Sequence, residues 1–297
     1  MAKKQNDIFK RQNEKEMQEL IVAQHFTYSN AKVWSTILFF VLVVVPILIN
    51  IALYFNTPDI VTGILAFVSL ALLGIGELIR EYILNQKKLA AMIQQKFDIY
   101  VFNINAQCGI DENLIAEQVE KYKTKDWNRK KNWYQDYEDM AKNKAVFYCQ
   151  KENIDWTGNI NKKYCCFLFV VITISLISFL INLIINNSSI IKILSILVTA
   201  LPLISYAFSG YKKIKHDNDE LLELEKLSNE INDNIDNIDD IELSNKINVL
   251  QTMLYKFRQT KYLIPDWFEK KFQKHLQAVE NRKARQRITK HKKSKTK

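Results

Sequence analysis

The sequence predicts an all-α membrane protein, with four transmembrane helices in two hairpins and a helical cytosolic domain. Four long apolar runs interrupt a chain that is otherwise rich in charge, so the mean hydropathy of −0.16 conceals a strong segregation. An apolar helix of about 20 residues spans a hydrocarbon core of about 30 Å. The charged segments show no alternating strand pattern, so we expect the N-terminal, central and C-terminal segments to build a helical cytosolic domain.

The first hairpin is predicted over residues 33–79, with spans at 34–55 and 60–79. No charged residue lies between Val33 and Pro58. Lipid offers no partner for free backbone amides, so two helices joined by a tight turn are the simplest structure for these runs.

Special residues are expected to shape both helices of this hairpin. Pro46 can bend the first span, and Asn50, one turn later, can satisfy a polar group that the proline frees. In the second span, Gly63, Gly74 and Gly76 are expected to permit close contact between helices.

The second hairpin is predicted over residues 164–211, with spans at 164–185 and 188–211. Hydroxyl and amide side chains repeat along one face of each span, at Ser175, Ser178, Asn182, Ser195 and Thr199. Hydrogen bonds between helices are the favoured role of these side chains. The alternative is the wall of a water-filled path, so the same residues are the pore-lining candidates.

Residues 1–32 are predicted to form an amphipathic cytosolic helix that leads into the membrane. Leu20, Ala23, Phe26, Tyr28 and Ala31 recur at mixed spacings of three and four. Such a helix can pack on the cytosolic domain, which is the favoured alternative, or lie in the membrane surface and move on activation.

Residues 80–163 form the central cytosolic segment, which is predicted to be helical. Its second helix is expected to begin with Asp111 as N-cap and Glu112 in the first turn. An aromatic and basic patch follows, and its members are Trp127, Arg129, Lys130, Lys131, Trp133, Tyr134 and Tyr137.

Residues 212–281 form a third cytosolic helical segment, and residues 282–297 a basic tail that we expect to be disordered. Leu224, Leu227, Ile231, Ile238 and Ile241 fit the apolar positions of a heptad repeat. Two to three heptads are too few for a coiled coil, so packing within the chain is favoured and helix-mediated oligomerisation stays open. The tail holds nine of the basic residues that give the chain its net charge of +10.

Basic residues next to the spans lie on one side of the membrane, among them Lys32, Arg80, Lys163 and Lys212. The positive-inside rule therefore places both termini and the large segments in the cytoplasm.

Motifs of catalysis are missing from the sequence. It has no P-loop, no nucleophile elbow and no zinc-protease motif, and its cysteines lack the spacing of a metal site. We therefore expect a protein that is not an enzyme and holds neither metal nor cofactor. Because the positive charge is concentrated in the tail, DNA or RNA binding is not expected either.

Several short blocks recur in order around the four predicted spans. The blocks are Arg11-Gln12-Asn13, Ile93-Gln94, Phe97-Asp98, Trp133-Tyr134, Cys149-Gln150-Lys151-Glu152-Asn153 with Trp156, and Ile264-Pro265-Asp266-Trp267-Phe268. In this order they resemble the SMODS-associating four-transmembrane effectors of bacterial CBASS anti-phage systems. The resemblance covers nearly the whole chain except the tail. Two departures stand out, because the family pattern has arginine at Lys151 and an acidic residue at Thr157.

The resemblance implies a multi-pass protein of the bacterial inner membrane that a cyclic di- or trinucleotide activates. A nucleotidyltransferase of the cGAS/DncV-like class would make this second messenger, and the cytosolic domain of the effector would bind it. The spans would then rearrange or assemble into a homo-oligomer that breaches the lipid bilayer and stops the infected cell.

Cyclic oligonucleotides require cations for their phosphates and flat side chains for their bases. The ligand-binding candidates of these types are Arg11, Arg129, Lys130, Lys131, Trp133, Tyr134, Lys151, Trp156, Arg258 and Trp267. For each of them, helix packing or a solvated surface is the competing role. The alternative function is a non-catalytic scaffold or adaptor whose apolar stripe from Leu224 to Ile241 recruits a protein partner, and a lipid-modifying enzyme is the weakest alternative.

Overall fold

The computed structural model describes residues 6–55, 57–106, 109–127, 131–185, 190–265, 267–268, 270–272, 278–279, 282–283 and 285–289, with the backbone alone for 156–162, 182–183, 185 and 191. Every regular element in these ranges is a helix, which confirms the predicted all-α class. The elements in order are α1 (Ile8–Arg11), α2 (Lys15–Phe39), a π-helix η1 (Phe40–Val44), α3 (Val45–Ala52), α4 (Asp59–Phe102), α5 (Glu112–Tyr122), α6 (Lys142–Ile185), α7 (Ile190–Asn234) and α8 (Asp240–Thr260).

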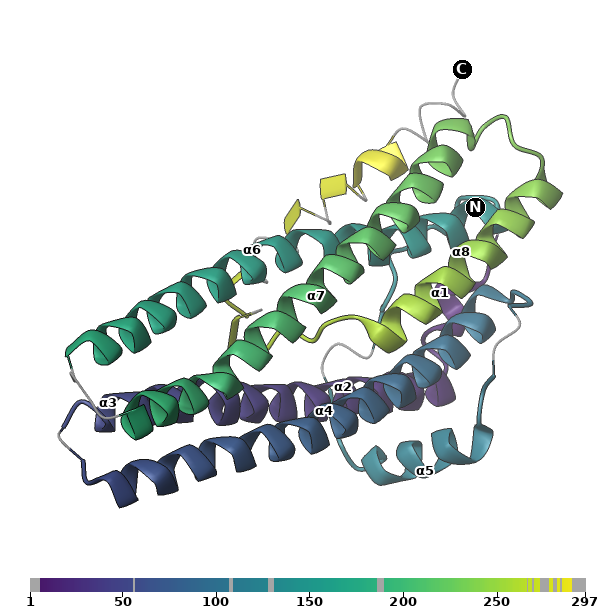
Figure 1. Ribbon diagram of the computed structural model, residues 1–297. Coiled ribbons are helices and arrows are strands. Elements are labelled where there is room, and N and C mark those ends of the chain that lie inside the picture. The colour runs from purple at the N-terminus through teal and green to yellow at the C-terminus, as the bar shows by residue number, and fades with distance from the viewer. Residues whose placement is uncertain are drawn as a thin grey trace.

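Four long rods run side by side along the molecule (Figure 1). The rods are α2–η1–α3, α4, α6 and α7, and each contains a helix long and apolar enough to cross a membrane. The rod α2–η1–α3 packs on α4, α4 on α7, and α7 on α6. The end of α3, the start of α4, the end of α6 and the start of α7 lie at one end of the bundle, whereas α5 and α8 lie toward the other (Figure 1).

The rods do not stop where the apolar runs stop. Helix α4 has 44 residues, so at about 1.5 Å per residue it is about 66 Å long, twice the thickness of a hydrocarbon core. Helices α6 and α7 are of the same length, 44 and 45 residues. Helices α4, α6 and α7 therefore each join a predicted span to a predicted cytosolic helix, so a movement of one half can be passed to the other.

Large apolar side chains point outward along the predicted spans. Phe55, Phe67, Phe169 and Ile184 each expose more than 70% of their surface. An apolar belt of this extent is unfavourable in water and favourable in lipid.

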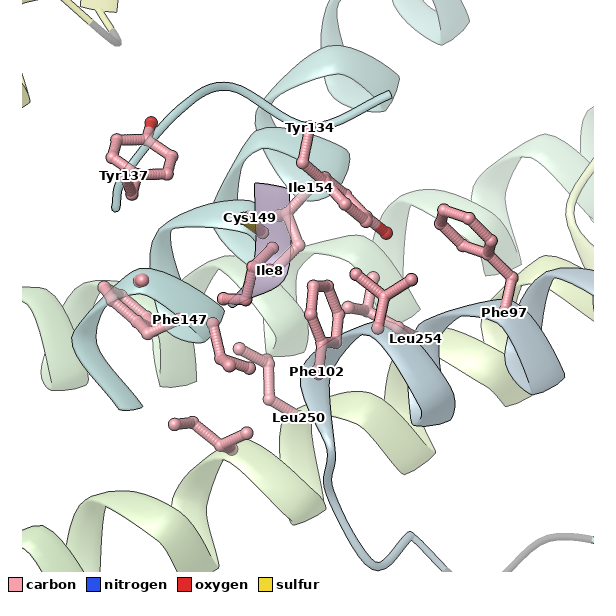
Figure 2. Packing of buried hydrophobic residues seen from close by; sticks show 14 of the residues in the cluster. Ile8, Phe97, Phe102, Tyr134, Tyr137, Phe147, Cys149, Ile154, Leu250 and Leu254 are labelled. Carbon is pink, nitrogen blue, oxygen red and sulfur yellow. The ribbon is translucent and has the colours of Figure 1, made fainter. Parts of the chain in front are cut away.

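Two hydrophobic clusters fill the interior. One joins the predicted cytosolic halves of the rods to α1, α5 and α8, and its members include Phe97, Phe102, Phe147, Leu250 and Leu254 (Figure 2). The other begins at Tyr28, continues between the spans and includes Leu42, Tyr164 and Phe268.

The first span bends through a change of helix type. Pro46 has no backbone N–H and its ring crowds the carbonyl of Leu42, so the five residues before Val45 widen into the π-helix η1. Asn50 is buried and donates from Nδ2 to Oγ of Ser178 on α6 at 3.2 Å. The amide therefore joins the two hairpins, a partner that the sequence did not predict.

Of the three glycines in span two, Gly76 lies in a tight contact. A Cβ atom on Gly76 would lie 2.9 Å from both Cδ atoms of Leu42, whereas one on Gly63 or Gly74 would meet no atom within 4 Å. Close approach of the first two rods thus depends on one of the three positions.

Helix ends follow the capping pattern of the sequence. The Asp111 carboxylate accepts from the backbone N–H of Asn113 and Leu114 at 3.0 and 3.1 Å, which confirms the predicted start of α5. Asp239 caps α8 in the same way, with both bonds at 2.9 Å.

The predicted heptad stripe is divided between two helices. Helix α7 ends at Asn234, and Ile238 lies in the turn before α8. Leu224 and Ile231 are buried inside the molecule, whereas Ile241 is 78% exposed. The stripe as one continuous helix face was therefore wrong, because Asp239 caps a new helix inside the repeat.

Both ends of the chain differ from their predicted form. The N-terminal segment is two helices with a turn between them, and α2 buries Leu20, Ile21 and Ala23 in the core, which favours the packed alternative over the membrane-surface one. In the tail, residues 285–289 are helical where disorder is predicted, because Arg287 and Ile288 have partners on the bundle.

Candidate functional site

The ligand-binding candidates that the structure describes do not converge on one place. Tyr134 and Arg258 are buried together in the predicted cytosolic bundle, Lys151 of α6 contacts Ser228 of α7, and Trp267 lies beside the predicted spans. Arg129 and Lys130 lie outside the described residues, as does the side chain of Trp156. Two polar clusters and one segment after α8 make the main contacts between the helices on which the other candidates lie.

Asp98 on α4 is the centre of the first cluster, which we call the Asp98 cluster. Its carboxylate accepts from the Tyr134 hydroxyl at 2.5 Å, from Arg258 Nη1 at 2.6 Å and from Gln251 Nε2 at 3.0 Å. Gln251 belongs to α8 and also donates to Gln95 at 2.7 Å. The cluster thus joins α4, α8 and the segment before α6 through one carboxylate.

Two amides of the cysteine-containing block on α6 complete the Asp98 cluster. Gln150 Nε2 donates to Gln251 Oε1 at 2.9 Å, and Asn153 Nδ2 donates to the Tyr134 hydroxyl at 3.3 Å. The blocks around Asp98, Tyr134 and Gln150 are therefore neighbours in space.

Burial makes the ion pair between Asp98 and Arg258 sensitive to the loss of either residue. The side chains of Asp98 and Arg258 are 0% and 5% exposed. Burial disfavours the charge on Arg258, but the Asp98 carboxylate more than offsets this effect, so the pKa of Arg258 is raised. Burial, with Asp98 beside it, also raises the pKa of Tyr134 well above its usual value.

Tyr134 and Arg258 are therefore structural in this state. The Tyr134 ring packs between Phe97 and Phe102, with centroids 6.2 and 5.0 Å away, and points into the core (Figure 2). Within the described part of the chain, Nη2 of Arg258 and Oε1 of Gln150 are buried without a hydrogen-bond partner. Since such atoms cost free energy, the cluster has unused hydrogen-bonding capacity.

The second cluster surrounds Asp155 on the cytosolic half of α6, and we call it the Asp155 cluster. Arg287 Nη2 lies 2.7 Å from its carboxylate, Lys283 Nζ 3.5 Å and Lys151 Nζ 3.8 Å. Lys151 also donates to Asn229 Oδ1 of α7 at 3.0 Å. Lys151 is a ligand-binding candidate of the sequence, whereas Asp155 and the two C-terminal cations that share it were not predicted.

Arg11, Lys131 and Trp133 lie on a third surface. Arg11 donates from Nη1 to the Tyr100 carbonyl at 3.1 Å and lies over the Tyr100 ring, and Lys131 is exposed. Trp133 is partly buried and packs on Trp127 with ring centroids 5.8 Å apart. The structure does not bring these three to either cluster.

Residues 261–265 and 267–268, which we call the collar, connect α8 to the spans. Lys87 of α4 donates to the carbonyls of Thr260 and Lys261 at 2.9 and 2.8 Å, where α8 ends. Ser35 of α2 donates to the Leu263 carbonyl at 3.3 Å. The collar therefore contacts the first two rods at the boundary between cytosolic helix and span.

The collar also contacts the other two rods. Asp217 of α7 accepts from the Tyr262 backbone N–H, and the Tyr262 hydroxyl lies 3.0 Å from that of Tyr206. Tyr164 of α6 packs on the Tyr262 and Phe268 rings, with centroids 5.7 and 5.0 Å away. Movement of α8 would therefore reach all four rods through the collar.

Trp267 belongs to the collar and is 46% exposed beside the predicted spans. It packs edge-on against Phe167 of α6, with centroids 5.5 Å apart, and near Phe39 of the first rod. Tryptophan is enriched at membrane interfaces, so this position suits an anchor rather than a nucleotide contact.

Three of the pore-lining candidates are buried in the bundle, since Ser175, Ser195 and Thr199 are 5%, 7% and 0% exposed. Ser178 accepts from Asn50, as described, and this bond joins two helices. Ser175 donates to the Val171 carbonyl and Thr199 to the Ile196 carbonyl, each at 2.7 Å and each within its own helix. The side chain of Asn182 lies outside the described residues.

Sequence reasoning missed the residues that organise the two clusters. Gln95 and Asp98 share the apolar stripe of α4, as Gln251 and Arg258 share that of α8. Polar residues on a core-facing stripe are the signal that points to a buried cluster. Asp155 and Arg287 carry no such signal, because nothing in the chain links two positions 132 residues apart.

Comparison with known proteins agrees with this architecture. A family model described as the SMODS-associating 4TM effector domain matches residues 6–287. A probable CBASS effector molecule from Bacillus cereus (strain VD146) is 26% identical over 272 residues, which cover 88% of this chain and 91% of that protein. No solved structure matches the chain. The chain, a multi-pass membrane protein with four apolar rods, belongs to the family of SMODS-associating 4TM effectors.

Proposed function

We propose that this protein is a membrane effector of a bacterial CBASS anti-phage system, activated by a cyclic oligonucleotide. The family match and the Bacillus relative support the class of protein. The observation that carries the mechanism is the continuity of the rods, since α4, α6 and α7 each join a cytosolic helix to a span.

In this mechanism the ligand binds the cytosolic bundle and stabilises a second arrangement of its helices. A ligand shifts a conformational equilibrium only by its difference in affinity for the two states. The unused polar atoms of Arg258 and Gln150 and the cations around Asp155 provide groups for such a difference. The collar transmits the change to the spans, which assemble as a homo-oligomer and permeabilise the membrane.

The protein acts at the inner membrane with both termini in the cytoplasm. The basic flanks at Lys32, Arg80, Lys163 and Lys212 support this orientation by the positive-inside rule. A reporter enzyme that is active only in the cytoplasm is expected to be active when fused to either terminus. A reporter that is active only after export is expected to be inactive at both.

Vesicles of bacterial lipid containing the purified full chain test the activity. Cyclic di- and trinucleotides, added one at a time on the cytosolic side, are expected to release an entrapped dye for at least one member of the panel. Linear dinucleotides of the same bases serve as the control. Absence of release with every cyclic nucleotide, from protein shown to be folded and inserted, would overturn the proposal.

The scaffold alternative has lost its main support. It relied on a free apolar stripe from Leu224 to Ile241 for a protein partner, but Leu224 and Ile231 are 1% and 0% exposed. The buried part of the stripe offers no surface for recruitment, whereas Ile241 at its end is 78% exposed.

A further inference from the structure

The Asp155 cluster gathers positive charge from two distant parts of the chain around a single carboxylate. Lys151 comes from α6, and Lys283 and Arg287 come from the C-terminal segment, yet all three form ion pairs with Asp155. Three cations surround one carboxylate at ion-pair distance, and such a group can attract a second anion beside it.

Burial makes the charged groups of this cluster costly, because they have lost part of their hydration. The side chains of Lys151 and Arg287 are each 12% exposed, and that of Asp155 is 15% exposed. Burial, which outweighs the nearby Asp155 carboxylate, lowers the pKa of Lys151. An anion that adds negative charge here would relieve this cost.

The Arg287 guanidinium has one nitrogen, Nη1, that could donate to a ligand. Its Nη2 atom pairs with Asp155, whereas its Nη1 atom is buried without a hydrogen-bond partner among the described residues. A guanidinium that uses one edge and leaves another nitrogen unbonded is suited to the several oxygens of a phosphate group.

Neutral groups line the same place. Asn229 accepts from Lys151 at 3.0 Å, Ser228 lies 3.4 Å from the same Nζ atom, and the Tyr148 ring lies under Arg287. Two further carboxylates act on the cations electrostatically, Glu152 on Arg287 and Glu225 on Lys151. The Tyr137 hydroxyl donates to Glu152 at 2.5 Å, and Tyr137 also interacts with Arg287.

We propose that the Asp155 cluster is a phosphate-binding site in which Arg287 and Lys151 are the donors, Lys283 lies at the rim, and the ligand is a phosphodiester of the activating cyclic oligonucleotide. The identity of the ligand rests on the proposed function; the phosphate site itself does not. Asp155 holds the cations in place until the ligand arrives. Binding would join α6, α7 and the C-terminal segment through one anion.

Inorganic pyrophosphate is the first probe, because it carries adjacent phosphates without a base. The full chain in nanodiscs of neutral phosphatidylcholine is titrated at constant ionic strength, and binding is followed by calorimetry. Arg287→Gln and Lys151→Gln are each expected to weaken binding at least about tenfold, as loss of one charge-assisted hydrogen bond predicts. Lys123→Gln on α5, which removes an exposed charge paired with Glu120, is the matched control and is expected to change nothing.

The substitution Asp155→Asn distinguishes an anion-binding role of the cluster from a purely structural role of its ion pairs. Removal of the competing carboxylate is expected to tighten pyrophosphate binding about threefold or more, although it removes three ion pairs from the folded chain. A structural role alone predicts that all three substitutions destabilise the protein and leave affinity unchanged. No binding to the wild type, or equal binding to the Gln variants, would overturn the site.

Two further binding experiments identify the molecule that carries the phosphate. A cyclic nucleotide that releases dye in the vesicle assay is expected to lose affinity in the same variants, in neutral nanodiscs. If the variants alter binding only when phosphatidylglycerol is present, a lipid headgroup is the ligand and the nucleotide assignment is wrong. If pyrophosphate binds as expected but no cyclic nucleotide binds the wild type, the site stands and the proposed function fails.

Discussion

At the residue scale, the ion pair between Asp98 and Arg258 holds the cytosolic bundle together across 160 residues of sequence. A buried pair is weak evidence of net stability, because both charges lose their hydration. Removal of one partner is different, since the other charge is then left buried and unpaired. The pair therefore selects one arrangement of α4 and α8 over alternatives.

Arg258→Leu is expected to lower the free energy of unfolding by about 3–5 kcal/mol, because Asp98 loses its counter-charge in the core. Denaturant titration of the full chain in nanodiscs, followed by tryptophan fluorescence, measures this change. The double variant Asp98→Leu, Arg258→Leu should recover part of the loss. Lys144→Gln, which removes an exposed pair with Asp236, is the control and should cost less than about 1 kcal/mol.

Lys87 gives the stability of the protein a dependence on pH. Burial, together with Lys213, lowers its pKa to about 8, although Asp217 opposes the shift and Lys261 and Lys88 add to it. In the unfolded chain the amine titrates near 10.5. Between these values the unfolded chain holds a proton that the folded chain has released, so the free energy of unfolding rises with pH, by up to about 1.4 kcal/mol per unit.

The measurement is a comparison of unfolding free energy between the wild type and Lys87→Met from pH 7 to pH 10. The wild type is expected to gain stability relative to the variant above pH 8, and the difference should be flat below it. Parallel curves over the whole range would contradict the lowered pKa.

At the scale of elements, the contact between the first two rods depends on the lack of a side chain at one position. Gly76→Ala places a methyl group 2.9 Å from the Leu42 side chain, which is itself fully buried. We expect a loss of about 1–3 kcal/mol from overpacking, measured by thermal unfolding in nanodiscs. Gly63→Ala meets no neighbour and should be neutral or slightly stabilising, since alanine favours the helix. Equal effects of the two substitutions would argue against close packing at Gly76.

At the scale of the whole molecule, the collar is the shared contact between the cytosolic bundle and the four rods. Tyr262 contacts α6 through the Tyr164 ring and α7 through Tyr206 and Asp217. If the collar transmits the signal, its loss should separate ligand binding from membrane permeation.

Tyr262→Ala is expected to keep nucleotide affinity within about threefold while dye release falls at least about tenfold, because the coupling free energy between the two sites is lost. Calorimetry and the vesicle assay measure the two quantities. Tyr262→Phe, which keeps the ring and loses the hydroxyl, should lie between the wild type and Tyr262→Ala. Tyr211→Ala, which removes an exposed tyrosine of α7 outside the collar, is the control. A proportional loss of binding and release would place Tyr262 in the ligand site instead.

The sequence by itself determined the helical class, the four apolar spans and the family. These are local properties: an apolar run is long enough or not, a cap such as Asp111 bonds its own helix, and short blocks keep their order along the chain. Only the tertiary structure decided which polar residues meet. Tyr134 and Arg258, two ligand-binding candidates, hydrogen-bond Asp98 in the core, and Lys151 shares Asp155 with Lys283 and Arg287 of a tail expected to be disordered. Contacts across 132 or 160 residues depend on how the rods pack, and residue type and spacing do not encode that packing locally.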